Sequence, residues 1–155
     1  MNTNAKRIAL PVLLLAFALV AAACSSDDSG GGCDDIDVEN AWLRLPPGEN
    51  TALYFDAANS GETDSALTGA SSDIANMYEL HETEMVEGKM EMKPVEGQEV
   101  PIPAGATVSF EPGGLHVMVM GLTGDLQEGD EVDFTLTFSD DCVKEITAPV
   151  EAFTQ

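Results

Sequence analysis

The sequence predicts an all-β domain, an antiparallel Greek-key sandwich or barrel, and three observations support this fold class. Short runs with strand character follow one another from Cys33 to the C-terminus, and glycine- and proline-rich turn signals separate them. Two of these runs alternate apolar and polar residues, as half-buried strands do, and no convincing helical period occurs. With 155 residues and 44% hydrophobic residues, the chain is long enough for one domain with a buried core.

Nine segments are expected to form strands, each between turn signals such as Pro46-Pro47-Gly48 or Pro112-Gly113-Gly114. Residues 132–138 place four apolar side chains on one face and three polar ones on the other. In residues 115–120, His116, Met118 and Met120 share one face, and the aliphatic residues share the opposite one. The nine expected strands are residues 36–43, 52–58, 65–69, 74–81, 88–93, 107–110, 116–120, 131–138 and 142–150.

The N-terminal segment has the pattern of an export signal. Lys6 and Arg7 precede the apolar run 8–23, which as a helix is about 24 Å long and too short for a stable membrane span. The ending Ala21-Ala22-Ala23-Cys24 resembles a lipobox, although Ala21 stands where Leu is usual, and plain cleavage without lipid remains the alternative. We therefore expect a lipoprotein-type signal peptide (1–23), a flexible linker (24–32) and a folded domain (33–155), with the exported protein at the outer face of the cytoplasmic membrane or in the periplasm.

The three cysteines fit this location. If Cys24 carries lipid, Cys33 and Cys142 remain as an even pair in an oxidising compartment, where a disulfide would join the two ends of the domain. Binding of a metal by these two thiolates is the alternative, but two isolated cysteines lack the short spacing of thiolate metal sites.

Charge and composition exclude several function classes. There are 28 acidic residues against 6 lysines and arginines, with a formal net charge of −22, so phosphate backbones and anionic lipid headgroups would repel the protein. We expect no nucleic-acid partner, and membrane contact only through the N-terminal lipid. No nucleophile–base arrangement or spaced carboxylate pair stands out, so an enzyme is not expected.

Both histidines lie in methionine-rich segments. If Glu87-Gly88 is the centre of a two-residue hairpin turn, His81 opposes Pro94 and Met92 becomes the diagonal neighbour of His81 on the same face. In the other segment, His116 and Met118 are two residues apart on one strand and project from the same face. These four side chains are the candidate metal ligands.

The chemistry of this set favours Cu(I). Imidazole suits several transition metals, but thioether sulfur is soft and selects Cu(I) over Zn(II) and hard cations. Thioethers also escape the disulfide formation that disables free thiolates outside the cytoplasm. The alternative is that the methionines are ordinary core filler and the histidines ordinary surface residues.

The segments Glu79-Leu80-His81-Glu82-Thr83 and Met92-Lys93-Pro94-Val95, together with residues 112–122, resemble the periplasmic copper chaperones called PCuAC. The resemblance runs from residues 41–44 to the 135–138 strand. The family pattern is a His, ten residues, a Met, about twenty-one residues and His-x-Met; here the second interval is twenty-three, and we place the excess in the 96–105 loop.

The resemblance implies a cupredoxin-like sandwich that holds one Cu(I) per chain with His81, Met92, His116 and Met118. It also implies delivery of copper to the dinuclear copper centre of a respiratory cytochrome oxidase, alongside a thioredoxin-like copper chaperone. Some relatives carry a His- and Met-rich C-terminal tail for a second ion; residues 151–155 do not have this composition, so we expect a single site. Two alternatives stay open: a lipoprotein for copper storage or detoxification, and a metal-free lipoprotein that binds another protein.

Overall fold

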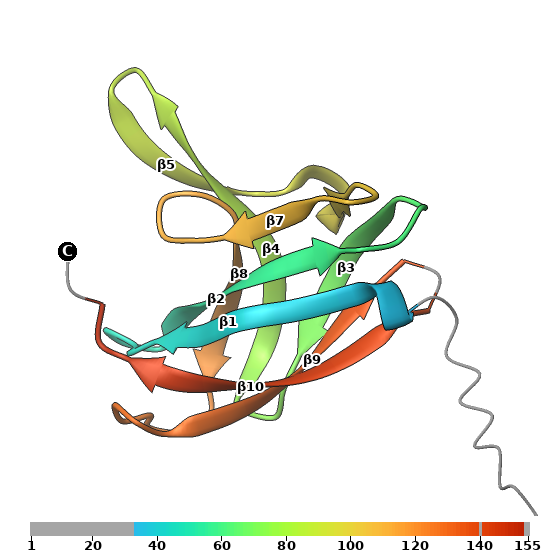
Figure 1. Ribbon diagram of the computed structural model, residues 1–155. Coiled ribbons are helices and arrows are strands. Elements are labelled where there is room, and N and C mark those ends of the chain that lie inside the picture. The colour runs from blue at the N-terminus through green and yellow to red at the C-terminus, as the bar shows by residue number, and fades with distance from the viewer. Residues whose placement is uncertain (1–32, 140, 154–155) are drawn as a thin grey trace, which may run out of the picture.

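The computed structural model describes residues 33–139 and 141–153, which form a β-sandwich (Figure 1). The expected signal peptide, the linker and the lipidation candidate Cys24 lie outside the described residues. Within the described ranges, the regular structure consists of strands and two one-turn 3₁₀ helices, Cys33–Asp35 and Glu96–Gln98. This confirms the all-β fold class. None of the helices described has the length and apolar character needed to cross a membrane.

The strands agree closely with the nine expected segments, and one further strand is present. Most boundaries differ by one or two residues, except that β4 runs five residues further into the hairpin than expected. The strands are β1 (Ile36–Arg44), β2 (Asn50–Asn59), β3 (Ser65–Ser71), β4 (Ala75–Val86), β5 (Lys89–Pro94), β6 (Val100–Ile102), β7 (Thr107–Phe110), β8 (His116–Leu122), β9 (Glu131–Phe138) and β10 (Val143–Glu151).

The strands form two layers that share one edge. The first sheet has the order β5-β4-β8-β2-β1, with β7 also paired to β2, and the second has the order β10-β9-β3-β6. The layers are joined by β1 and β10, which pair in parallel at Leu43–Val150 and Arg44–Glu151. All other strand pairs are antiparallel, so the expected antiparallel arrangement holds except at this seam.

The core lies between the two sheets. The apolar face of β9 is buried as its alternation predicted, with Val132, Phe134, Leu136 and Phe138 each 5% exposed or less. It packs against the inner face of the first sheet, including Leu53, Phe55, Leu80, Val117 and Val119. Burial of this apolar surface is the main stabilising contribution, and the side chains on the opposite, outer face of the first sheet are not part of this core.

The additional strand β6 was not expected, because prolines flank and interrupt it. Val100 and Ile102 are buried on either side of the exposed Pro101, and β6 pairs only with β3. Proline cannot donate to a strand ladder, but an edge strand needs hydrogen bonds on only one side. The side chain of Asn59 secures this edge by donating to the carbonyl of Ile102 at 3.0 Å.

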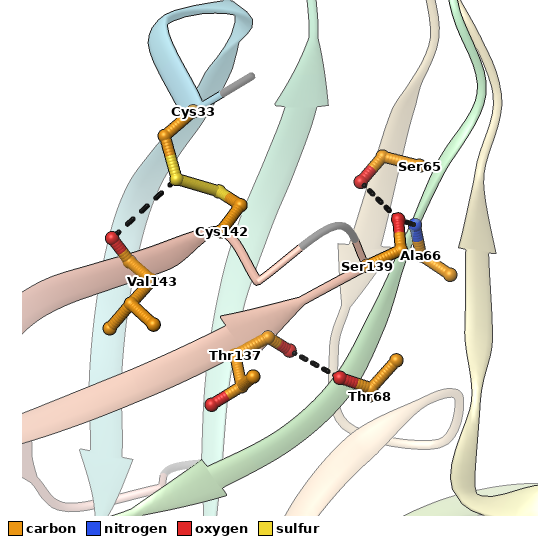
Figure 2. The surroundings of a disulfide bond; sticks show 8 residues. All are labelled: Cys33, Ser65, Ala66, Thr68, Thr137, Ser139, Cys142 and Val143. Carbon is orange, nitrogen blue, oxygen red and sulfur yellow. Dashed lines mark hydrogen bonds between the residues drawn. A yellow bond between two sulfur atoms is a disulfide. The ribbon is translucent and has the colours of Figure 1, made fainter. Parts of the chain in front are cut away.

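A disulfide links the two ends of the domain (Figure 2). Cys33 precedes β1 and Cys142 precedes β10, and their Cα atoms are 5.2 Å apart, which is the pairing expected from the sequence. Nearby, the hydroxyl of Ser139 accepts a hydrogen bond from the amide of Ala66 at 3.1 Å, and Thr68 donates to the carbonyl of Thr137 at 3.1 Å (Figure 2). These bonds hold β3 against β9 at the end of the sandwich that carries the disulfide.

Candidate metal centre

The pairing of β5, β4 and β8 places the four candidate ligands on one face of the first sheet. His81 lies directly opposite His116 across the β4–β8 pair. Met118 follows His116 by two residues and projects from the same face. Met92 lies opposite Thr83, which is two residues from His81 and shares its face. Because Leu80 and Val117 point into the core, the face that carries the four ligands is the outer one.

The hairpin register is confirmed. The turn residues Glu87 and Gly88 have φ angles of +50° and +82°, as a type I′ turn requires, and Val86 pairs with Lys89. Counting back along this ladder, His81 pairs with Pro94, and Met92 is its diagonal neighbour. The hairpin tip extends beyond the two layers of the sandwich (Figure 1).

The two imidazole rings are adjacent, and one has an unused nitrogen. Their centroids are 5.8 Å apart. His116 is 2% exposed, and its Nδ1 lies 3.1 Å from the carbonyl oxygen of Gly114, which accepts the Nδ1 hydrogen. Nε2 of His116 is buried and has no hydrogen-bond partner among the described residues. A buried polar atom without a partner costs free energy, so this lone pair is available for a ligand.

Burial of His116 was not predicted by the alternation along β8, which placed it on the face away from the core. It is covered on that face by neighbouring side chains, because the ring of Tyr54 lies 6.1 Å from its imidazole and that of Trp42 lies 4.6 Å from Tyr54. Phe153 stacks on Trp42 at 6.2 Å. This aromatic cluster (Trp42, Tyr54 and Phe153) shields one side of the candidate centre from water.

Burial also sets the charge of His116. It lowers the pKa of the imidazole below the ordinary 6.5, and the nearby His81 lowers it further, while the hydrogen bond with Gly114 acts in the opposite direction. His116 is therefore neutral at pH 7, the form in which imidazole binds a metal.

Glu79 is a residue of the site that sequence reasoning missed. Its Oε2 lies 2.9 Å from Nε2 of His81, and a carboxylate can only accept, so Nε2 carries the hydrogen and Nδ1 holds the lone pair of a neutral ring. Glu79 also faces Met118 across β4 and β8. The signal that could have found it is the period-two alternation along β4, which puts residues 79 and 81 on the same face.

The two thioethers differ in exposure. Met118 is half-buried beside the histidines, between β4 and β2, whereas Met92 on the outer strand β5 is 62% exposed. The candidate centre thus has a buried side formed by His116 and an open side formed by Met92. A ligand can reach it without opening the core.

Gln98 holds β4 in place next to His81. Beyond Pro94 the strand β5 has ended, although the amide of Val95 still donates to the Leu80 carbonyl at 2.8 Å. The side chain of Gln98 completes the pairing with the backbone of Leu80. Its Oε1 accepts the Leu80 amide hydrogen at 2.7 Å, and its Nε2 donates to the Leu80 carbonyl at 3.0 Å and to that of Val95 at 3.1 Å. Gln98 lies in the 96–105 loop. This is the loop in which we placed the two residues by which the interval between Met92 and His116 exceeds the family pattern.

The fold and these side chains define a class of protein: a small β-sandwich that presents two histidines and two methionines on the outer face of one sheet. The family model described as "Putative lipoprotein LpqE-like" matches residues 36–150, and the chain belongs to this family. Its domain is of the PCuAC type, as the motifs indicated.

Individual relatives agree with this assignment. The chain is 33% identical over 150 residues to "Putative lipoprotein Lxx21020" of Leifsonia xyli subsp. xyli, which covers 97% of this chain and 90% of that protein. The structure is similar to the copper-bound PCuAC domain from PmoF2, with a TM-score of 0.63, 27% identity, and coverage of 77% of this chain and 94% of that one. It is also similar to the solution structure of Cu(I)-DR1885 from Deinococcus radiodurans, with a TM-score of 0.60, 27% identity, and coverage of 83% and 87%.

Proposed function

We propose that this protein is an extracytoplasmic Cu(I) carrier that holds one ion tightly with His81, Met92, His116 and Met118. The observation that carries the proposal is the buried Nε2 of His116, which lacks a hydrogen-bond partner among the described residues and lies in a neutral ring beside His81. Two imidazoles and two thioethers match the preference of Cu(I) for soft and borderline donors. The similarity to copper-bound PCuAC domains supports the same ion.

The arrangement suits a carrier better than an enzyme. The exposed Met92 gives an acceptor protein direct access to one ligand, and a thioether can leave the metal without taking up a proton. Exchange with an acceptor can then proceed one ligand at a time. Lipidation at Cys24 would hold the protein near a membrane-bound acceptor and raise its effective concentration.

For the acceptor, we propose the dinuclear copper centre of a respiratory cytochrome oxidase, with a thioredoxin-like copper chaperone as a further partner. This step rests on the resemblance of the motifs to those of PCuAC proteins. A test is to mix the Cu(I)-loaded protein with the isolated copper-binding domain of such an oxidase. Transfer of copper to that domain supports delivery, and retention of the ion would favour storage or detoxification.

Copper binding itself is tested by competition with a Cu(I) chelator under reducing conditions. We compare the parent protein with His116→Ala, Met118→Ala and the matched control Met77→Ala, which removes a thioether from the same face of β4 outside the proposed ligand set. Loss of an outer-shell partner commonly costs about 10–100-fold in metal affinity, so loss of a ligand should cost at least about tenfold. The control should bind like the parent. Equal affinity in all four proteins would refute the ligand assignment.

A further inference from the structure

The outer face of the β4–β5 hairpin carries more thioethers than the proposed carrier site uses. Met85 and Met90 lie directly opposite each other near the turn, and Met92 follows Met90 by two residues on the same face. All three are well exposed, at 65%, 57% and 62%. Of the six exposed large hydrophobic side chains among the described residues, five lie on β4 or β5.

The two faces of the hairpin are chemically distinct. The face opposite the methionines carries charged side chains, with Nζ of Lys93 2.8 Å from Glu84 and 3.4 Å from Glu82. Solubility alone would favour charged side chains on both faces, because exposed apolar residues on a projecting hairpin promote association. The exposed methionine face therefore indicates a binding surface.

Met85 and Met90 are close enough to share one ion. Directly opposed residues in an antiparallel pair have Cβ atoms about 4.5–5.5 Å apart, and the flexible methionine side chains can bring both sulfur atoms to a common point. The terminal methyl of Met90 lies 3.5 Å from the position that a Cβ would occupy at Gly113. Met90 thus bends back toward the loop before His116, that is, toward the four-ligand centre.

We propose that Met85 and Met90 form a second, weaker Cu(I) site, with the neighbouring Met92 within reach of both sites. Thioethers alone are soft, uncharged donors that select Cu(I), and two of them bind it less tightly than a set with imidazoles. The net charge of −22 raises the local concentration of cations. The site receives Cu(I) at the projecting tip and passes it to the histidines. This inference rests on the proposed carrier function and adds a second ion to the single Cu(I) expected from the sequence.

The test is an anaerobic titration with Cu(I) against a weak competing chelator, combined with X-ray absorption at one and at two equivalents. The parent should take up a tight first equivalent and a weaker second one, and the second should add sulfur neighbours only. The double variant Met85→Leu/Met90→Leu should keep the first equivalent and lose the second. Leucine preserves side-chain volume at these exposed positions, and an unchanged melting temperature verifies the fold.

The matched control is Met77→Leu, which removes a thioether of similar exposure, 52%, from the same face of β4 on the other side of the histidines. It should retain both equivalents. The proposal is overturned if the parent binds only one ion, if the double variant keeps the second, or if Met77→Leu abolishes it. Each of these results leaves the first equivalent intact, whereas failure of the carrier function itself would remove the tight first equivalent.

Discussion

At the residue scale, His116 combines three features that prepare an imidazole for a metal. It is buried, its Nδ1 is fixed by the carbonyl of Gly114, and its Nε2 has no hydrogen-bond partner among the described residues. The hydrogen bond at Nδ1 sets the tautomer and the ring orientation before any ion arrives. The free energy lost by leaving Nε2 unpaired is regained when a ligand binds there.

The first prediction concerns the protonation of His116 in the metal-free protein. Because burial lowers its pKa, the His116 ring should titrate at a midpoint below 6.5 in an NMR pH titration. The unfolded chain then binds the proton more readily than the folded one. The contribution of His116 to folding is complete above pH 6.5 and is lost as the pH falls through the lowered pKa. A midpoint at or above 6.5 would contradict the burial seen here.

The second prediction concerns Gln98. Gln98→Ala leaves the amide of the buried Leu80 without the partner it now has, whereas the Leu80 carbonyl keeps its bond from the amide of Val95. The free energy of unfolding should fall by about 1–3 kcal/mol. Cu(I) affinity should fall as well, because Leu80 precedes His81. Denaturant unfolding and chelator competition measure the two effects. The exposed Gln127→Ala serves as the control, and equal behaviour of the two variants would show that Gln98 does not hold β4 in place.

The placement of the four candidate ligands on one face could be predicted from the sequence, because spacing along a strand and across a tight hairpin is a local signal. That they bind a metal stays a prediction. Glu79 and Gln98 could not be assigned in the same way. The contact of Glu79 with His81 depends on side-chain rotamers, and Gln98 acts only because β5 ends at Pro94 and leaves the Leu80 amide for a side chain to pair with. No sequence pattern marks a side chain that pairs with the backbone of a strand where the neighbouring strand has ended.

At the scale of elements, the β4–β5 hairpin determines whether Met92 and His81 share a face. Its register follows from the two-residue turn, and this was predictable because Glu-Gly at a tight turn fixes the pairing of every residue behind it. The strand β6 was not predictable in this way, since its prolines are acceptable only at a sheet edge, and edge position is a property of the assembled sandwich.

The third prediction uses this register. Met92→Leu should weaken Cu(I) binding, and a thioether introduced at Thr83, directly opposite on the same face, should restore part of the affinity in Met92→Leu/Thr83→Met. A thioether one residue along the strand, in Met92→Leu/Lys93→Met, should not, because it points to the opposite face. Chelator competition on the three variants measures this. Rescue by position 93 but not by position 83 would show that the outer face is not the binding face.

At the scale of the whole molecule, the disulfide and the candidate centre lie at opposite ends of β2. Near the disulfide, Asn59 at the end of β2 pairs with Ile36, whereas near the centre Ala52 pairs with Met118. The parallel pairing of β1 with β10, which joins the two sheets, was not predicted. The alternation of apolar and polar residues is the same whether a strand pairs in parallel or antiparallel with a strand far away in the sequence.

The fourth prediction follows from this separation. The disulfide closes a loop with a sequence separation of 109 residues. Its removal in Cys33→Ala/Cys142→Ala should lower the free energy of unfolding by about 2–5 kcal/mol, mainly by freeing the unfolded chain. Cu(I) affinity should remain that of the parent as long as the variant is folded. A large loss of affinity in the folded variant would mean that the two ends of the sandwich are coupled.

In the proposed copper site, two imidazoles and two thioethers from β4, β5 and β8 meet around one Cu(I) ion. X-ray absorption at the copper edge of the one-to-one complex tests it most directly. We expect two nitrogen and two sulfur neighbours, with one nitrogen lost in His116→Ala and one sulfur lost in Met118→Ala. A copper environment of nitrogen and oxygen alone, or one that neither substitution changes, would contradict it.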